Sequence, residues 1–237
     1  MTGTPATQNL SSSLSLHILK SFDKNRSGFS LDVRVDIHPG ITIIFGPSGA
    51  GKTTLLECIA GILTPDSGRV AMGEDIFFES SRKISVDIRK RRIGYVFQDL
   101  ALFPHLNVQR NVQYGIRNST AGNREQRTEA ILASFKISGL ADRKPSEISG
   151  GERQRVALAR SLVTDPCVLL LDEPLAALDE PTKLKIIDDL RSWNEVHGVP
   201  ILYVTHSRQE AFALGVRVLM LEAGKIIADG SPEAVMR

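Results

Sequence analysis

Gly46-Pro47-Ser48-Gly49-Ala50-Gly51-Lys52-Thr53 is the stretch from which the fold class of this chain can be inferred. The apolar run Ile41 to Phe45 precedes it and predicts a buried strand. A helical pattern begins at Lys52, continues to Ala60 and stops at Gly61. The sequence therefore predicts a strand, a glycine-rich loop and a helix in succession.

The loop matches G-x-x-x-x-G-K-[ST], the P-loop motif, and each residue type suits contact with phosphate. Glycines let backbone amides approach phosphate oxygens, and the helix N-terminus that follows favours an anion. Lys52 supplies positive charge to the β and γ phosphates, while the Thr53 hydroxyl can ligate Mg²⁺. A chance match is expected on the order of once in a hundred chains of this length. The predicted nucleotide contacts are Gly46, Pro47, Ser48, Gly49, Ala50, Gly51, Lys52, Thr53 and Thr54.

The composition of the chain excludes several classes of protein. Its 237 residues, 42% hydrophobic and 24% charged, are enough to bury a core. Lys and Arg number 29 against 27 Asp and Glu, so the net charge of +2 does not indicate a nucleic-acid partner. No apolar run approaches the roughly 18 residues that cross a bilayer. Cys58 and Cys167, flanked by apolar residues, are typical of reduced, buried thiols.

Secondary-structure patterns divide the chain. Strand-like alternation dominates from Leu14 to Val70, whereas residues 85–158 are mostly helical, with an amphipathic helix predicted over 124–138. From Val168 onward strands and helices alternate, which is typical of parallel α/β units. The predicted strands there are 168–171, 201–204 and 216–221, and the predicted helices are 182–196 and 207–214.

Two carboxylates follow the apolar run Val168 to Leu171. Asp172 and Glu173 stand where a strand buried on both faces would carry its chemistry, at the carboxyl end. Adjacent residues on an extended chain point in different directions, so the two can do different work. Asp172 is predicted to hold Mg²⁺ or its water, and Glu173 to face the water that attacks the γ-phosphate. A solvated acidic turn is the weaker alternative beside a P-loop.

Ile148-Ser149-Gly150-Gly151-Glu152-Arg153-Gln154-Arg155 resembles the signature sequence of ABC-type ATPases. Ser149, Gly150 and Gly151 open a helix, and an amide-rich helix N-terminus suits a phosphate. A Gly-Gly turn capping a surface helix would explain the glycines alone. The resemblance implies a head-to-tail dimer, in which this segment of one copy closes over the γ-phosphate held by the P-loop of the other.

Three further elements of the family follow in the expected order. Gln98, after Tyr95-Val96-Phe97, is similar to the Q-loop glutamine, which touches Mg²⁺ and the attacking water. Asp179 resembles the aspartate of the D-loop, which crosses the dimer interface. His206 resembles the switch histidine, which contacts the γ-phosphate and holds the base and water in line. The resemblance thus implies catalytic roles for Glu173, His206, Gln98 and Lys52, metal binding by Thr53, Gln98 and Asp172, and nucleotide contacts by Ser149, Gly150, Gly151 and Asp179.

The resemblance also implies an α/β P-loop NTPase fold. A RecA-like core would carry an N-terminal antiparallel β-subdomain and an α-helical subdomain inserted at about 99–160. We expect residues 1–13, which are polar and lack the features of a secretion signal, to form a flexible tail, and residues 14–237 to form the ATPase domain.

The sequence departs from the family pattern at several positions. Ile148 and Glu152 replace the commoner Leu and Gln of the signature. No Tyr or Trp lies about two dozen residues before the P-loop, so Phe22 is predicted to stack on adenine, with Phe29 as the alternative. Gly215-Val216 precedes Arg217 where relatives often have Ala-Asp, so a local carboxylate contact to Arg217 is expected to be missing. The basic run 89–92 is interpreted as a solvated face.

Residues 99–108 are unusually apolar for a loop, which indicates a partner surface. In the family this surface receives a membrane subunit; the alternative is that Leu102 and Phe103 pack within the helical subdomain. The motifs look most like those of ATPase subunits of bacterial molybdate importers, whose relatives import sulfate, iron, sugars or polyamines. A soluble ABC ATPase in DNA repair or assembly is the rival from another class.

The resemblance implies ATP and Mg²⁺ as cofactors, and a homodimer as the assembled state. It further implies two integral membrane permease subunits, an indirect periplasmic or extracellular binding protein, and a peripheral place on the cytoplasmic face of the membrane. The sequence ends soon after Val235, so we expect no regulatory domain and no substrate feedback through one.

Overall fold

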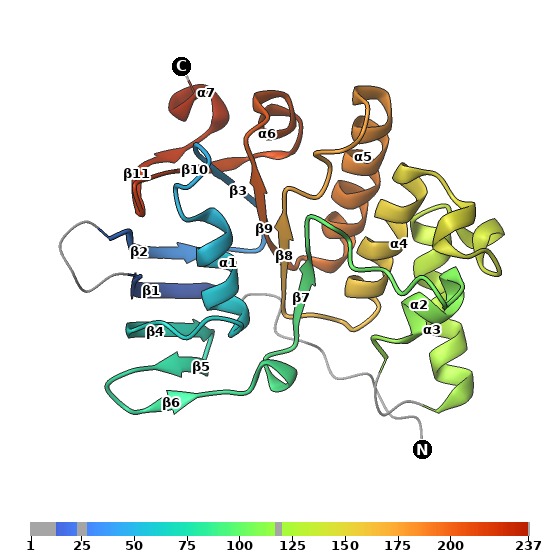
Figure 1. The fold of residues 1–237 in the computed structure, drawn as a ribbon, viewed down its shortest axis with the longest axis horizontal. Helices are drawn as coiled ribbons and strands as arrows, with labels where there is room; N and C mark the ends of the chain where they lie inside the picture. Colours follow the sequence, from blue (N-terminus) through green and yellow to red (C-terminus); the bar gives the residue numbers. More distant parts are fainter. Residues whose placement is uncertain (1–12, 23–27, 117–119, 237) are drawn as a thin grey trace.

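The computed structural model describes residues 13–22, 28–116 and 120–236. Its strands join in one 11-stranded sheet with the order β6-β5-β4-β1-β2-β11-β10-β3-β9-β8-β7 (Figure 1). The strands are β1 (Leu14–Ser21), β2 (Ser30–Ile37), β3 (Gly40–Phe45), β4 (Ser67–Met72), β5 (Asp75–Glu79), β6 (Ile84–Ser85), β7 (Ile93–Val96), β8 (Val168–Asp172), β9 (Pro200–Thr205), β10 (Arg217–Glu222) and β11 (Lys225–Gly230). The helices are α1 (Lys52–Ala60), α2 (Val108–Gln113), α3 (Ala121–Ser134), α4 (Gly150–Leu162), α5 (Glu180–His197), α6 (Arg208–Leu214) and α7 (Pro232–Val235).

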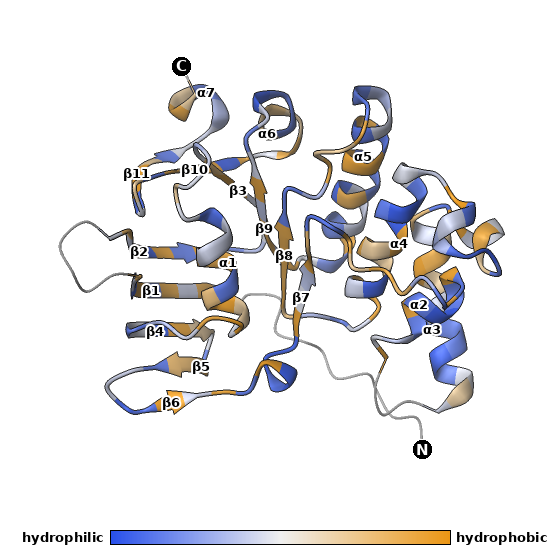
Figure 2. Cartoon of the chain, viewed as in Figure 1, coloured by the Kyte–Doolittle hydropathy of each residue, from blue (hydrophilic) through white to orange (hydrophobic). Residues whose placement is uncertain are grey.

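One half of the sheet is parallel and carries the predicted site. Strands β7, β8, β9, β3 and β10 pair in parallel, in that spatial order. Every residue of β8 and β9 is buried, and Figure 2 shows the apolar character of both strands. A strand covered on both faces needs such a continuous apolar run. The carboxyl ends of β3, β8 and β9 therefore meet at one edge, where the glycine loop begins.

The other half is antiparallel and includes the N-terminal strands. β1 pairs with β2 and β4, and β5 joins β4 to β6. On β2 the residues Leu31, Val33 and Ile37 are buried and alternate with more exposed residues, as the sequence predicts. The two halves meet between β2 and β11, where a single register pair, Lys225 with Asp32, is formed.

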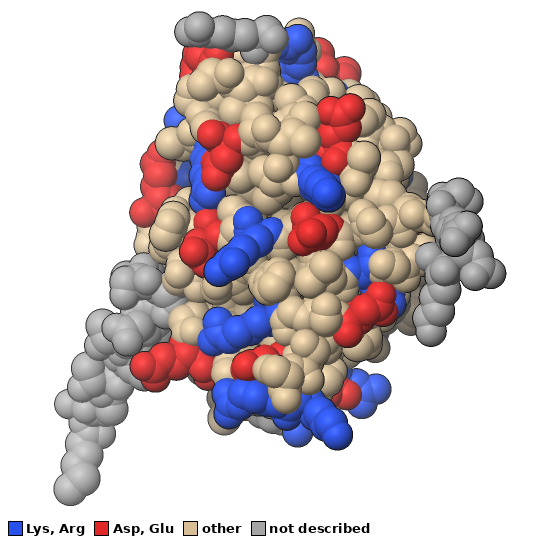
Figure 3. Space-filling model, turned by 90° about the vertical axis from the view of Figure 1, so that its left-hand side faces the viewer, with Lys and Arg blue, Asp and Glu red and all other residues tan. Residues whose placement is uncertain are grey.

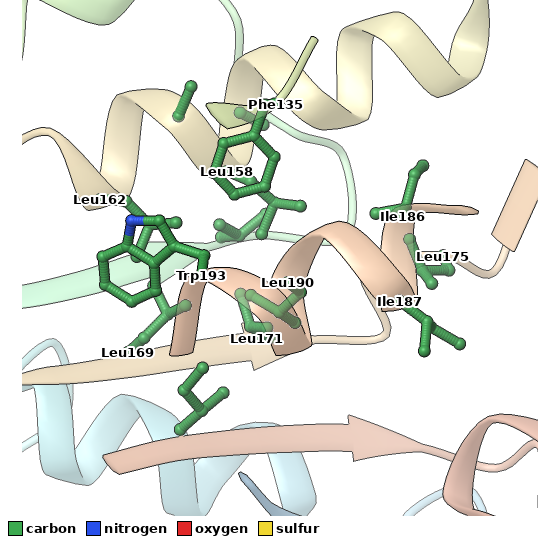
Figure 4. Close-up of a cluster of buried hydrophobic side chains, with 14 of the residues drawn as sticks. Phe135, Leu158, Leu162, Leu169, Leu171, Leu175, Ile186, Ile187, Leu190 and Trp193 are labelled. Carbon is green, nitrogen blue, oxygen red and sulfur yellow. The ribbon is translucent and has the colours of Figure 1, made fainter. Parts of the chain in front are cut away.

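Helices α2, α3 and α4 form a group beside the parallel half of the sheet (Figure 1). The group shares one core with that half through α5. Figure 4 shows Trp193 and Leu190 of α5 among residues from α4 and β8. The helical group is therefore fastened to the sheet by apolar packing of side chains. The labelled members of this cluster are Phe135, Leu158, Leu162, Leu169, Leu171, Leu175, Ile186, Ile187, Leu190 and Trp193.

The predicted elements from 168 onward are confirmed within one or two residues, and the helix predicted over 124–138 is confirmed with shifted bounds. The helix predicted over 124–138 is α3, which begins at Ala121 because Thr120 caps it by accepting from the amide of Asn123. It ends at Ser134, before Lys136 adopts a φ of 56°. The mostly helical region 85–158 also contains β7, a four-residue strand too short to show a period. Of the predicted tail, residues 1–12 lie outside the described residues.

The basic run 89–92 is not a uniformly solvated face. Arg91 is buried and donates to the carbonyls of Cys58 and Ile59 in the last turn of α1, and to that of Val86. Those helix carbonyls lack partners within the helix, so a guanidinium with several donors fits there. Gly61 leaves space for it, since a Cβ at Gly61 would lie 2.5 Å from Arg91 Cζ. The expectation of a solvated face is therefore wrong for Arg91.

The expected lack of a carboxylate contact to Arg217 is also wrong. Asp229 on β11 accepts from Arg217 Nε at 2.8 Å and from Nη2 at 2.7 Å. Arg217 Nη1 also donates to the carbonyl of Asp36. The sequence neighbours of Arg217 could not show this, because the partner belongs to the next strand.

We expect Asp229→Asn to destabilise the protein by at most about 1 kcal/mol at pH 7, because the pair is partly exposed. The hydrogen bonds from Arg217 lower the pKa of Asp229. The contribution is then present above the ordinary aspartate pKa, roughly 3.9, and is lost as the pH falls through the lowered value. Urea unfolding of both proteins from pH 7 to pH 2.5 should show the difference shrinking with acid; a constant difference would contradict the pairing.

The two cysteines lie in the apolar surroundings that their sequence neighbours predict. Cys58 is buried and Cys167 partly so, and both are free thiols; burial raises the pKa of Cys58 to about 12.

The face turned to the viewer in Figure 3 carries acidic and basic side chains side by side. None of the helices formed by residues 13–22, 28–116 and 120–236 combines the length and apolar composition needed to cross a bilayer.

Candidate functional site

The glycine-rich loop connects β3 to α1, and two of its glycines are required by geometry. Gly51 has a φ of 101°, and a Cβ there would lie 2.5 Å from Cζ of Phe29. At Gly46 a Cβ would lie 2.1 Å from the carbonyl oxygen of Leu221 at the end of β10. Any side chain at either position would force the loop away from the sheet edge. The loop is thus held close to the backbone of its neighbours.

Lys52, the first residue of α1, points back into the loop. Its Nζ donates to the carbonyls of Gly46 and Pro47, each at 2.9 Å, and the residue is only 7% exposed. The two acceptors are neutral carbonyls, so no carboxylate pairs with the Lys52 ammonium in these bonds. The amide of Ala50 bonds to the carbonyl of Pro47 within the loop. The positive charge therefore lies in the concavity that the loop encloses.

Asp172, the last residue of β8, is joined by hydrogen bonds to the side chains of Thr53 and Tyr95. The first bond ties β8 to the first turn of α1, and the second ties β8 to β7. Burial raises the pKa of Asp172, and the bonds from Thr53 and Tyr95 oppose that rise. A hydroxyl and a carboxylate so placed form a set of oxygen donors that suits Mg²⁺.

Glu173 lies against His206, as the sequence resemblance implies. Oε2 of Glu173 is 3.2 Å from Nδ1 of His206, which follows β9. Glu173 has a φ of 45°, a left-handed conformation that costs energy for a residue with a side chain. Its amide donates to the carbonyl of Val204, which fixes this turn to β9. Asp172 is buried while Glu173 is partly exposed, so the two carboxylates do occupy different environments.

Gln98 and Phe22 are not brought into this cluster. Gln98 is exposed two residues beyond β7, next to Phe97, whose ring stacks on Tyr95 with centroids 4.2 Å apart. Phe22 is 53% exposed, and its ring centroid is 6.1 Å from that of Phe29. Phe29, by contrast, lies against Gly51 of the loop. Phe22 stays the prediction for the adenine stack.

Ser149 caps α4, and Glu152 completes the cap. The Ser149 hydroxyl accepts from the amide of Glu152, and Oε2 of Glu152 accepts from the amide of Ser149 at 2.7 Å and from its hydroxyl at 2.8 Å. This is a capping box, which satisfies two helix-end donors. The bonds from Ser149 lower the pKa of Glu152. The departure from Gln to Glu at 152 is therefore compatible with a well-capped signature helix.

The signature helix packs on the segment that contains Asp179. A Cβ at Gly151 would lie 2.5 Å from Cγ2 of Thr182, so glycine allows α4 and α5 to approach closely. Asp179 caps α5 by accepting from the amide of Thr182 at 3.0 Å. Both Ser149 and Asp179 are exposed. Within the described part of the chain, no hydrogen bond or ion pair connects these two residues to the glycine loop.

Residues 31–176 match the family model described as ABC transporter. This chain belongs to the ABC transporter family. Among curated relatives, it is similar to the molybdenum import ATP-binding protein ModC of Paramagnetospirillum magneticum, at 39% identity over 90% of this chain and 59% of the relative. ModC of Brucella melitensis is 42% identical over 88% of this chain and 58% of its own length.

Solved structures give the same result. The dimeric structure of MJ0796, a bacterial ABC transporter cassette, has a TM-score of 0.77 and 29% identity, covering 93% of this chain and 98% of that one. A post-hydrolysis state of MJ0796, bound to ADP and Pi, has a TM-score of 0.74. The fold is accordingly that of an ABC ATPase: a RecA-like core, an N-terminal antiparallel β-subdomain and an inserted α-helical subdomain. The chain spans about 60% of the length of the curated ModC relatives it matches.

Two residues of this ABC site were not predicted from the sequence. Tyr95 bonds to Asp172, but a tyrosine on a short strand gives no signal of that contact. Glu210 contacts residues next to His206, and here a signal exists: Ser207 and Glu210 fit the S-x-x-E pattern of a capping box. The Ser207 hydroxyl does accept from the Glu210 amide, but the Glu210 carboxylate turns inward instead.

Proposed function

We propose that this chain is the ATP-hydrolysing subunit of an ABC importer, with molybdate as the imported solute. The observation that carries the proposal is the convergence of three strand ends. The glycine loop with Lys52 follows β3, Asp172 is bonded to Thr53, and Glu173 lies 3.2 Å from His206. Phosphate-binding, metal-binding and base functions are thus provided at one sheet edge.

Each group has a role that its environment supports. The loop amides and Lys52 bind the β and γ phosphates of ATP. Thr53 and Asp172 would hold Mg²⁺, which would neutralise charge that develops on the phosphates. Glu173 accepts a proton from the attacking water, and His206 orients the Glu173 carboxylate. The strained backbone at Glu173 keeps that carboxylate less buried than Asp172, where water can reach it.

The active assembly we infer is a head-to-tail homodimer. Ser149 and Asp179 are exposed and belong to adjoining segments, so together they present one surface to a second copy. The amides at the N-terminus of α4, with Gly150 and Gly151, would face the γ-phosphate held by the other copy. The dimeric structure of MJ0796 supports this arrangement for a related cassette.

A groove of about 980 Å³ between the core and the helical group is the proposed docking site for the membrane subunits. Exposed aromatic residues line it, with Tyr114 65% and Phe97 40% exposed, and Arg89 and Arg92 stand among them. Exposed aromatic surface indicates a protein partner. Of the apolar loop, Leu102 packs on the helical core, whereas Phe103 lines the groove. The position of Leu102 fits packing within the helical subdomain, and the position of Phe103 supports the proposed partner surface.

We expect Tyr114→Asp to weaken binding to the membrane subunits by roughly 30-fold or more, as for an aromatic hot spot worth about 2 kcal/mol. The measurement is the dissociation constant in detergent or nanodiscs. Val196→Asp is the matched control, because Val196 is 78% exposed on α5 and does not line the groove. Equal affinities of both variants, with both folded, would rule out the groove as the docking site.

Reconstitution tests the solute. The membrane proteins that co-purify with this chain are placed in liposomes with their binding protein, and ATP hydrolysis is measured with molybdate or sulfate. We expect molybdate to stimulate hydrolysis. Stimulation by sulfate alone would make the chain a sulfate-importer subunit. Absence of any ATP hydrolysis, with all components folded, would refute the proposed ATPase activity. The related alternatives for the solute are those of sulfate, iron, sugar and polyamine importers.

A further inference from the structure

A buried carboxylate lies behind His206. Glu210 on α6 is 3% exposed, and its Oε2 accepts from the hydroxyls of Tyr203 at 3.0 Å and Thr205 at 2.8 Å. Its Oε1 is 3.1 Å from Nζ of Lys183 on α5, which is also buried. A buried charge is tolerated only when it is paired and hydrogen-bonded, and Glu210 meets both conditions.

This carboxylate fixes the backbone on both sides of His206. Thr205, bonded to Glu210, also accepts from the amide of Ser207 at 3.0 Å. Ser207 in turn accepts from the amide of Glu210 at 3.3 Å. The His206 side chain itself is 66% exposed, and its contact with the site is the one to Glu173. The backbone on either side of His206 is therefore held through Thr205 and Ser207, both of which bond to Glu210.

The second arm of the network reaches the segment that contains Asp179. Lys183 lies in the first turn of α5, where its amide donates to the carbonyl of Asp179 and its Nζ also contacts Glu180 at 3.1 Å. Burial alone would lower the pKa of Lys183, but the bonds that its ammonium donates to Glu210 and Glu180 outweigh burial and raise that pKa. Glu210 is therefore the point where the start of α5 and the loop of His206 are tied together.

We propose that Glu210 is a positioning residue, which holds His206 against Glu173 and links that contact through Lys183 to the segment of Asp179. The inference rests on the proposed ATPase function and deepens it. Glu210 acts through His206 and contacts no substrate. Its loss should slow turnover, because small misplacement of a catalytic group is costly, while leaving ATP binding at the loop in place.

The first test is the steady-state ATPase rate of Glu210→Gln in the full chain. We expect kcat to fall roughly 10- to 100-fold, with the dissociation constant for Mg·ATP changed less than about threefold. The double variant Lys183→Met/Glu210→Gln removes both charges, so it leaves no unpaired buried ion. It should also show a lower kcat with a nearly unchanged dissociation constant for Mg·ATP. A kcat within twofold of the unaltered chain in both variants would overturn the proposal.

The decisive readout is a double-mutant cycle with His206. In a His206→Ala background, Glu210→Gln should reduce the residual rate by less than about threefold, because residues that act as a unit are not additive. Equal fold losses with and without His206 would show that Glu210 acts on stability alone. If the unaltered chain hydrolyses ATP and only the cycle fails, this inference falls while the proposed function stands.

A matched buried carboxylate provides the control. The carboxylate of Asp189 on α5 is 3% exposed and pairs with Lys136 and Arg155, away from the His206 loop. Asp189→Asn should lower the melting temperature while changing kcat less than about twofold. A kcat loss as large as that of Glu210→Gln would mean that losing any buried carboxylate slows the enzyme, and would overturn the specific role.

Discussion

Glu173→Gln should lower ATP turnover roughly 100- to 10,000-fold while Mg·ATP still binds, because general-base catalysis supplies about that factor. Glutamine keeps the shape of the side chain and an oxygen that can face His206 at the present 3.2 Å. It cannot accept the proton from water. With the next step blocked, the ATP-bound state should accumulate, and that state is the proposed dimer. Size-exclusion chromatography with Mg·ATP should therefore show twice the monomer mass.

The matched control for this trapped state is Glu195→Gln, which changes an exposed carboxylate near the end of α5, away from the segment of Asp179. It should elute like the unaltered chain and not accumulate as a dimer. A Glu173→Gln protein that stays monomeric with Mg·ATP, while the unaltered chain hydrolyses ATP, would contradict the mechanism. It would mean either that closure is not driven by ATP binding or that another group is the base.

Lys52→Ala should weaken ATP binding by about 30- to 150-fold, the loss of a charge-assisted contact of about 2–3 kcal/mol. The ammonium is 7% exposed and held by the carbonyls of Gly46 and Pro47, so its charge lies within the loop. AMP has no β or γ phosphate, so its weaker binding should change little. Isothermal titration with ATP and AMP separates the two effects.

Lys20→Ala is a control of the same type, because Lys20 on β1 pairs with Asp66, which precedes β4, and not with the loop. Its affinity for ATP should match that of the unaltered chain within about twofold. Equal losses of ATP and AMP affinity in Lys52→Ala would instead indicate that the loop had collapsed without its internal bonds. Circular dichroism with thermal melting distinguishes collapse of the whole fold from a local change.

Much of the fold follows from local pattern. The continuous apolar runs of β8 and β9 predict buried parallel strands, and Gly61 predicts the end of α1. Boundaries set by side-chain caps were less predictable, since the cap of α3 at Thr120 lies outside its apolar stripe. Exposed and half-buried residues alternate along β11, but its sequence has three apolar residues in succession at 226–228, so no alternation of residue types predicts this strand.

The residues of the candidate site were likewise predictable only in part. Lys52 follows from the glycine-loop motif, whereas Asp172 and Glu173 follow because they come directly after an apolar run that predicts a strand. The contact of Tyr95 with Asp172 could not be inferred, because it depends on β7 and β8 becoming neighbours in the sheet. Glu210 fits a capping-box pattern, but that pattern does not show that its carboxylate turns inward to Tyr203 and Thr205. Arg91 and Arg217 were misread for the same reason: their partners are far away in sequence or on another strand.

The narrow junction between β2 and β11 has a mechanical consequence. The backbone links described there are one register pair and the bond from the Asp32 amide to the Gly224 carbonyl. The two halves of the sheet are therefore joined by few backbone bonds. The glycine loop bridges that junction: Phe29 beside β2 lies against Gly51, and the Gly224 amide bonds to the Ala50 carbonyl. A ligand that makes the glycine loop more rigid should therefore restrain motion between the two halves of the sheet. Without a ligand in the loop, the two halves should twist more freely relative to each other.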